Sequence, residues 1–327
     1  MSDTFSNFSN SAFSLAGIPQ DGFLSSAVIE DIVAQQNPNN IGQITSHPAI
    51  QDRVEFVAKR LAMAPKTFSE QGQTMFIHRF LFQERSPAAL QDALSACALY
   101  SLKNVDNQAL VFRNLEQRQH QLIANTDILL ASEMDLLEAL QALILYQIIR
   151  LFDGDIRLRA QAEADEAVLM MWAAQLRLRT RHVQRSLPDP AEVQLLPEST
   201  SKDWRRWLIE ESSRRTVITA FMLKGVYDFL RLGYDTVPDF NMSFTAQAAL
   251  WNSQSEINWW RAHSEREQIE VPVTHWDEAI AKAKPNDLEE LGVLIMVMLK
   301  GIDATRKWLG QSHDIRYGLE AAEYRSV

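Results

Sequence analysis

The stretch LLEALQALILYQIIRLF, from Leu136 to Phe152, is the longest apolar run of the chain and decides its fold class. A helix that crosses a bilayer needs about 20 mostly apolar residues. This run has only 17 residues and is interrupted by four polar ones, namely Glu138, Gln141, Gln147 and Arg150. It therefore predicts a buried core helix over about 133–151 and no membrane span.

Helical periodicity continues on both sides of this run. From His47 onward, apolar residues recur every three or four positions, which is the spacing of one helix face. No stretch shows sustained strand alternation, and no repeat of fixed period indicates a solenoid. We therefore expect an all-α fold, a single large helical domain of about ten or more helices. Further helices are expected at about 106–124, 155–181 and 201–232, the last ended by Gly233, with Ser243 and Thr274 as N-caps of later ones.

The two ends of the chain are expected to differ from this body. Residues 1–45 are rich in Ser, Asn and Gln and carry a few phenylalanines, a composition that cannot bury enough surface to fold alone. They are predicted to form a mobile N-terminal tail, or a segment that docks through its phenylalanines. The helical domain is expected over 46–315, a proline-rich loop near 187–200, and a C-terminal tail over 316–327.

Composition limits the compartment and the partners. The formal charge of −10 and the pI near 5.3 oppose direct binding to nucleic acid, because phosphates are neutralised by Lys and Arg. The single cysteine, Cys97, cannot form an internal disulfide, and one cysteine supplies too few ligands for a Cys-ligated zinc site. No Lys or Arg precedes Arg53, so a secretory or mitochondrial leader is not expected. We expect an intracellular protein, in the nucleus or the cytoplasm, with no membrane partner.

Motifs that carry catalysis or cofactors are missing from the sequence. There is no Walker loop, dinucleotide fingerprint, Gly-x-Ser-x-Gly elbow, His-Glu-x-x-His helix or kinase signature. We therefore predict no catalytic residue, no metal ligand, no DNA-reading residue and no cofactor, and an enzyme is the less favoured interpretation.

Several weaker candidates have a simpler structural explanation. The acidic cluster at 163–166 has a spacing that a metal might use, but a solvated helix face is favoured because no His complements it. Asp153-Gly154-Asp155 indicates a turn followed by a helix cap rather than a calcium loop. The small apolar neighbours of Cys97 favour inert burial. The arginines between 177 and 215 favour a solvated face over a nuclear-import patch.

Tryptophans are concentrated in one third of the chain, and the candidate ligand-binding residues lie among them. Each tryptophan wants a partner for its indole N–H, so they either anchor the core, which is favoured, or line a ligand pocket. Glu211 and Arg215 lie four residues apart on the expected helix over 201–232, flanked by apolar residues on one broad face. The candidate ligand-binding residues are Trp207, Glu211, Arg215 and Trp251.

The segment WRRWLIEESSRRT, from Trp204 to Thr216, resembles the signature of the fungal-specific transcription factor domain, the regulatory region of zinc-cluster transcription factors. Three further stretches, at 89–100, 141–157 and 244–251, are similar to the branch found near secondary-metabolite gene clusters, in the same order. Together they span about 45–312. The resemblance implies an all-helical regulatory domain that responds to effectors, and it supplies no catalytic residues.

The chain departs from that family at its beginning. Zinc-cluster factors resemble one another in an N-terminal module of six cysteines that bind two zinc ions and read DNA, whereas residues 1–46 contain no Cys, Lys or Arg. If the chain is complete, only the regulatory part remains.

Two hypotheses of function follow. The first is a transcription-regulatory protein linked to secondary metabolism, which acts through a protein partner, either a transcription factor or a coregulator, or through a small-molecule effector. The alternative is a recruited enzyme or metabolite-binding protein of a fungal secondary-metabolite pathway. Its Trp-lined pocket would favour a cyclisation or rearrangement by shape. The sequence leaves the oligomeric state open.

Overall fold

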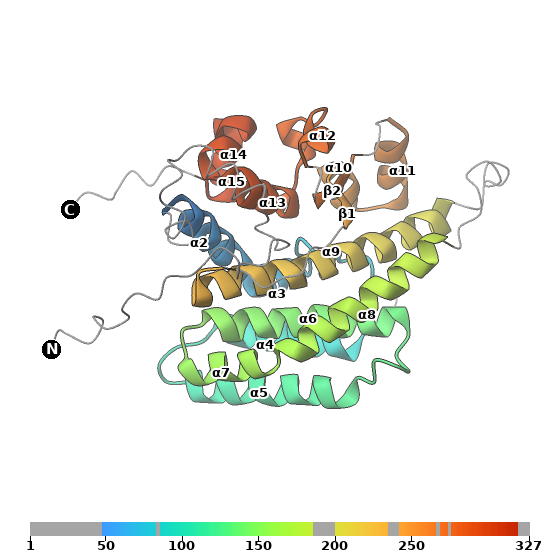
Figure 1. Ribbon diagram of the computed structural model, residues 1–327. Helices are drawn as coiled ribbons and strands as arrows, with labels where there is room; N and C mark the ends of the chain where they lie inside the picture. The colour runs from blue at the N-terminus through green and yellow to red at the C-terminus, as the bar shows by residue number, and fades with distance from the viewer. Residues whose placement is uncertain are drawn as a thin grey trace, which may run out of the picture.

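The computed structural model describes residues 48–82, 86–185, 200–234, 242–265, 269–273 and 276–319. Throughout these ranges the chain is almost wholly helical, which confirms the all-α prediction (Figure 1). The predicted N-terminal tail, residues 1–45, lies outside the described residues, as do most of the proline-rich loop and residues 320–327 of the predicted C-terminal tail. At that end, helical structure continues through Tyr317, and both Tyr317 and Leu319 are buried.

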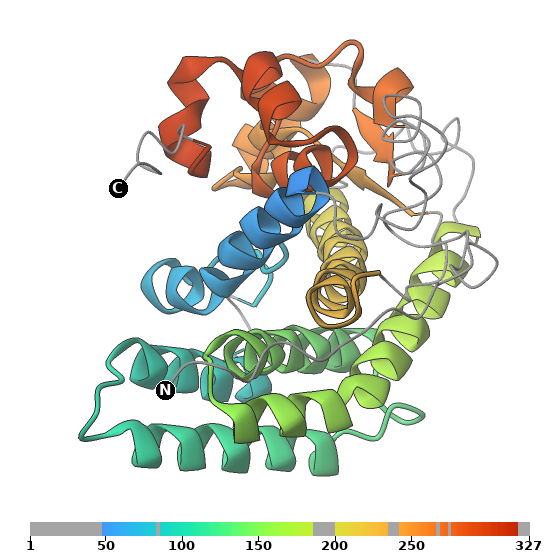
Figure 2. The same ribbon diagram turned by 60° about the vertical axis from the view of Figure 1, so that its left-hand side comes forward.

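The helices fall into a lower group and an upper group, as seen in Figure 1, and the long α9 (Thr200–Leu232) lies between them. The lower group is α4 (Ala88–Ser101), α5 (Gln108–Asn125), α6 (Glu133–Phe152), α7 (Ile156–Ala164) and α8 (Glu166–Arg185). α2 (Pro48–Ala62) lies beside α9, as Figure 2 shows, and α3 (Ala64–Gln71) follows it and packs against α4 and α6. The upper group is α10 (Ala248–Trp251), α11 (Glu256–Glu265), α12 (Trp276–Ile280), the 3-10 helix η4 (Pro285–Asp287), α13 (Glu290–Lys300), α14 (Ile302–Leu309) and α15 (Gln311–Tyr317).

α6 is the centre of the lower group, as the apolar run predicted. Almost every residue from Leu136 to Leu151 is buried, polar ones included, because α6 contacts α2, α3, α4, α5, α7, α8 and α9. Ser132 begins the helix with a capping box, in which its hydroxyl accepts the N–H of Asp135 at 3.1 Å. A helix that is apolar on all sides is stable in water only when it is surrounded in this way.

The turn after α6 confirms the interpretation of Asp153-Gly154-Asp155 as a turn and a cap. Gly154 has φ +100°, and the Asp155 carboxylate accepts the N–H of Leu158 at 2.8 Å as the N-cap of α7. The Asp153 carboxylate accepts hydrogen bonds from Tyr100 and from Lys103, so it joins this turn to α4.

The helix expected over 155–181 is instead two helices that meet at Asp165. The Asp165 carboxylate accepts hydrogen bonds from Arg150 at 2.7 Å and from Gln119 at 2.9 Å, both of which are buried. Glu166, next in the chain, pairs with Lys224 of α9 at 2.6 Å. The solvated-face interpretation of the 163–166 cluster is therefore wrong, because these carboxylates bind cations and amides of other helices.

A small sheet was not predicted. β1 (Ser243–Thr245) pairs antiparallel with β2 (Glu270–Pro272), with Phe244 opposite Val271. Three residues are too few to show strand alternation in a sequence. Ser243, expected as an N-cap, lies in β1, and Thr274 lies outside the described residues.

Two further predictions concern single side chains. Cys97 is buried, and burial raises the pKa of its thiol to about 12, which confirms the inert interpretation. Arg179 does not lie on a solvated face, because its guanidinium donates to the carbonyl groups of Ile128 and Ala131 in the loop before α6.

Candidate functional site

A buried ionic network on α9 joins distant parts of the chain. Glu211 and Arg215 are fully buried, and Arg215 Nε donates to Glu211 Oε1 at 2.7 Å. They lie one turn apart on the same face of α9, as their spacing of four predicted. Moving both charges out of water is costly, so the pair is stable inside the protein only if the remaining donors of Arg215 and the remaining acceptor sites of Glu211 are also hydrogen-bonded.

Arg215 uses its remaining donors to bind three other segments. Nη1 donates to the Glu289 carboxylate at 2.7 Å and to the Met75 carbonyl at 3.1 Å, and Nη2 donates to the Thr245 carbonyl at 2.8 Å. The guanidinium also lies 4.0 Å from the centroid of the Trp251 ring, a cation–π contact. One side chain thus connects α9 to the segment after α3, to β1, to α10 and to the start of α13.

The carboxylate of Glu211 also accepts hydrogen bonds from several partners. Its Oε2 accepts Arg214 Nη2 at 2.6 Å, and its Oε1 also accepts the N–H of Thr245 at 3.0 Å. Burial opposes ionisation of Glu211, yet the charges of Arg214 and Arg215 outweigh it and hold the pKa of Glu211 below its usual value. Burial raises the pKa of Glu289, whose interactions with Arg215 and the N–H of Leu291 only partly offset it.

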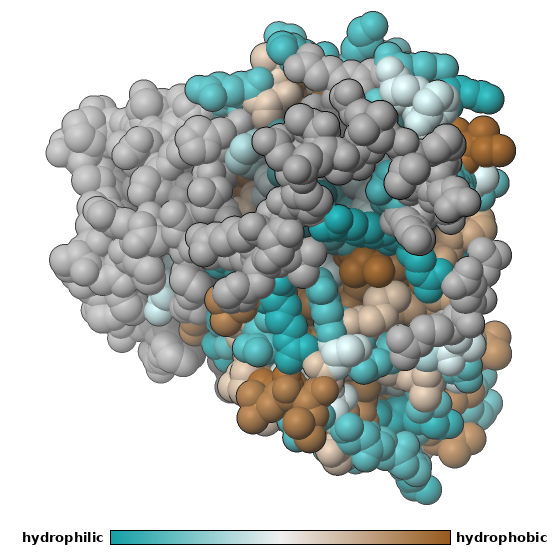
Figure 3. All heavy atoms as spheres, turned by 90° about the vertical axis from the view of Figure 1, so that its right-hand side faces the viewer, coloured by the Kyte–Doolittle hydropathy of each residue, from teal (hydrophilic) through white to brown (hydrophobic). Residues whose placement is uncertain are grey.

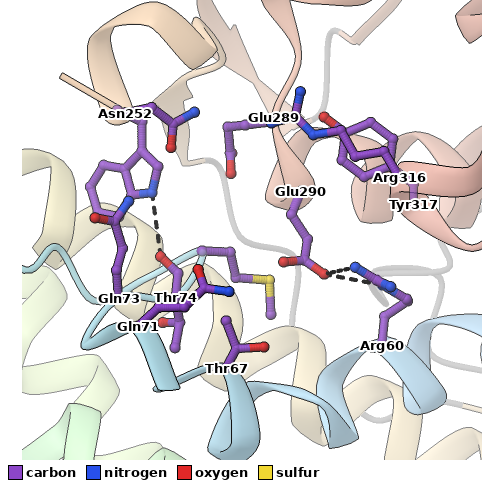
Figure 4. Close-up of a pocket in the computed structure, with 12 residues that line it drawn as sticks. Arg60, Thr67, Gln71, Gln73, Thr74, Asn252, Glu289, Glu290, Arg316 and Tyr317 are labelled. Carbon is purple, nitrogen blue, oxygen red and sulfur yellow. Dashed lines mark hydrogen bonds and ion pairs between the residues drawn. The ribbon is translucent and has the colours of Figure 1, made fainter. Parts of the chain in front are cut away.

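A polar hollow of ≈ 180 Å³, whose lining Figure 4 shows, lies next to this network. Trp251 and Glu289 belong to both, since each contacts Arg215 and also lines the hollow. The Trp251 indole N–H donates to the Thr74 carbonyl at 3.4 Å. The remaining lining residues are Arg60, Thr67, Gln71, Gln73, Met75, Asn252, Glu290, Arg316 and Tyr317.

Of the four predicted site residues, the structure brings three together. Glu211, Arg215 and Trp251 belong to one network, and Trp251 reaches the hollow. Trp207 does not join them, because it is only partly buried and packs against Trp259 of α11 at 5.7 Å between ring centroids. Whether any of the four binds a ligand stays a prediction.

Sequence reasoning missed Glu289 and Thr74, the partners from other parts of the chain. A local signal for Glu289 existed, because two acidic residues just before an apolar run, here Glu289 and Glu290 before 291–299, are typical of the start of a helix. The side chain of Glu289 does accept the N–H of Leu291. No spacing in the sequence links either residue to Arg215.

His78 lies beside the network and is expected to make stability depend on pH. It is buried, in edge contact with the Trp251 ring, and burial together with the charges of Arg215 and Arg79 lowers its pKa to about 4. The unfolded chain therefore binds a proton near pH 6.5 that the folded chain binds only near pH 4, so stability falls as the pH falls through this window.

We expect His78→Phe to remove up to about 3 kcal/mol of this acid destabilisation between pH 6.5 and pH 4. Urea unfolding at each pH measures the effect as the slope of stability against pH. His120→Phe, which replaces an exposed histidine of α5, should leave the slope as in the parent protein. If the slope of His78→Phe equals that of the parent protein, the acid destabilisation does not come from His78.

The lining of the site supplies hydrogen-bonding groups and charges. Within the described ranges, no three His, Cys, Asp or Glu side chains gather closely enough to hold a metal ion. None of the described helices is long and apolar enough to cross a membrane. On the face in Figure 3, hydrophobic residues form separate groups among hydrophilic ones.

Fold and site together define an almost wholly helical protein with a buried ionic network beside a small polar hollow. The chain is 69% identical over 325 residues to the protein named transcription factor gsfR2 of Penicillium aethiopicum, and the match covers 99% of this chain and 78% of that protein. The chain belongs to the same family as this transcription factor. No model of a protein family and no solved structure matches the chain.

Proposed function

We propose that this chain is a transcription-regulatory protein that resembles the regulatory domain of fungal zinc-cluster factors and acts through a protein partner or a small effector. The observation that carries the proposal is the 69% identity, over nearly the whole chain, to a protein named a transcription factor. The four signature stretches of the sequence support the finer assignment to the fungal-specific domain. Their similarity to the branch near secondary-metabolite genes supports a link to that metabolism, and action in the nucleus follows from the role.

The network gives such a protein a means of transmitting a signal. Met75 precedes α9 in the sequence, Thr245 and Glu289 follow it, and Arg215 binds all three. A ligand in the hollow would touch Trp251 and Glu289, so it would bias the arrangement of segments that Arg215 joins.

Deletion of the gene tests the proposal. We expect transcripts of a set of genes to change, and the parent coding sequence to restore them. Loss of a pathway product with unchanged transcripts would contradict the proposal and favour an enzyme. No observation favours that alternative at present, since the hollow of ≈ 180 Å³ is smaller than the 300–1,000 Å³ typical of pockets for drug-sized molecules.

The purified chain is expected to show no sequence-specific DNA binding at physiological salt. Its formal charge of −10 repels phosphates, and no six-cysteine module occurs in its sequence. A gel shift with genomic promoter fragments checks this, with a zinc-cluster protein that carries its DNA-binding module as positive control. A shifted band that survives excess nonspecific DNA would overturn the expectation.

A further inference from the structure

We propose that the polar hollow binds a small zwitterion of the α-amino acid class, with its carboxylate at Arg316 and its ammonium at Glu289. This inference rests on the proposed function in one respect, since it identifies the class of effector. Its physical basis is the charge, size and unused hydrogen-bonding capacity of the lining.

The charges of the lining favour a ligand without net charge. Arg60 and Arg316 oppose Glu289 and Glu290, so the formal charges of the lining cancel. The network behind the hollow adds two arginines, Arg214 and Arg215, against Glu211 and against Glu270, which lies 4.0 Å from Arg214, so its formal charges cancel as well. A ligand of net charge would bring an uncompensated charge to a partly desolvated wall, which is costly.

The separation of those charges favours a zwitterion over a neutral polyol. Arg60 is already bound to Glu290 at 2.6 Å, whereas Arg316 has no ion pair within the described part of the chain and lies 5.3 Å from the Tyr317 ring. A carboxylate is the natural partner for that guanidinium. Glu289, with a side chain only 5% exposed, supplies the opposite pole at the base. Each of its oxygens accepts one bond, from Arg215 or from the N–H of Leu291, and can accept another.

The close-up shows how these groups surround the space. In Figure 4, Asn252 and Gln73 lie on one side, and Arg60, Glu290 and Arg316 lie on the other. A volume of ≈ 180 Å³ is below the range of roughly 300–1,000 Å³ that is typical of pockets for drug-sized molecules. That space suits a single amino acid and is too small for a dinucleotide or a polycyclic metabolite.

The test uses the purified full chain and the twenty L-amino acids as separate probes in a thermal-shift assay. We expect at least one of them to raise Tm by about 5 to 10 °C at a concentration 100 times its Kd. Calorimetry then compares that amino acid with its N-acetyl and amide derivatives, which lack the ammonium and the carboxylate respectively. Both derivatives should bind at least tenfold more weakly.

Two variants assign the binding to the hollow. Arg316→Gln removes an exposed cation and should weaken binding at least tenfold without changing Tm in the absence of ligand. Lys307→Gln removes the same charge from an exposed position on α14 and should bind like the parent protein. The proposal is overturned if no amino acid raises Tm, if glucose or inositol binds and no amino acid does, or if Arg316→Gln binds unchanged.

Failure here is distinguishable from failure of the proposed function. A protein that binds no amino acid, yet whose gene deletion changes transcripts, refutes the ligand class alone. A protein that binds an amino acid at the hollow, yet whose deletion leaves transcripts unchanged, refutes the regulatory role alone.

Discussion

Replacing Glu211 by alanine is expected to lower the free energy of unfolding by about 3 to 5 kcal/mol, the range for breaking a buried ion pair. The side chain of Glu211 is fully buried and accepts hydrogen bonds from Arg214, from Arg215 and from the N–H of Thr245. Its removal leaves the buried Arg215 with one carboxylate, Glu289, instead of two. A partly satisfied buried network is less stable than a complete one.

The neighbouring residue provides a matched control. Glu210 also pairs with an arginine of α9, Arg206, at 3.0 Å, but that arginine is 46% exposed. Pairs of this kind contribute under about 1 kcal/mol because solvent screens them. Urea unfolding of Glu211→Ala and Glu210→Ala therefore compares the same substitution at adjacent positions. Equal losses in the two variants would mean that the buried network contributes no more to stability than the exposed pair does.

Local spacing made the α9 part of this network predictable. Steps of three and four between Trp204, Trp207, Glu211, Arg215 and Ile218 place these side chains on one broad face, because 3.6 residues complete a helical turn. Glu211 and Arg215 are on that face and buried, and the helix ends at Leu232 as Gly233 indicated. The central helix α6 was equally predictable from the sequence, since its apolar run leaves no polar face for solvent.

Partners from other segments were not predictable in the same way. Helical spacing specifies neighbours three or four residues apart, whereas Arg215 contacts Glu289 and Met75, which are 74 and 140 residues away. The polar hollow depends on such contacts, because its lining comes from α2, α3, α10, α15 and the start of α13. Its position followed only from the packing of the whole chain.

The burial of the tryptophans could not be predicted from local sequence either. Trp207 was expected to share the buried face with Glu211, but it is only partly buried and packs against Trp259. Trp251, in contrast, is 2% exposed, although its helix has four residues and no readable periodicity. Burial of an aromatic side chain is decided by what the rest of the fold places over it. We therefore expect a smaller loss of stability from Trp207→Ala than from Trp251→Ala.

Trp251→Ala should cost about 3 to 5 kcal/mol of unfolding free energy, as expected for a buried tryptophan replaced by alanine. The change opens a cavity between the network and the hollow and removes the ring that lies 4.0 Å from the Arg215 guanidinium. It also leaves the Thr74 carbonyl without the indole N–H. Trp251→Phe should cost less, because a ring remains against Arg215 and only the hydrogen bond and part of the volume are lost.

The control for Trp251 is Trp260→Ala on α11, where the side chain is 54% exposed and the expected loss is under about 1 kcal/mol. Urea unfolding followed by circular dichroism suits all three variants, since the signal does not depend on the tryptophan removed. Suppose that Trp251→Ala unfolds like the parent protein but no longer binds the amino acid. The ring would then act chiefly as a wall of the hollow, and its contact with Arg215 would contribute little to the fold. A large loss in Trp251→Ala with little change in Trp260→Ala instead places Trp251 in the core, and the cation–π contact with Arg215 is then part of what stabilises it.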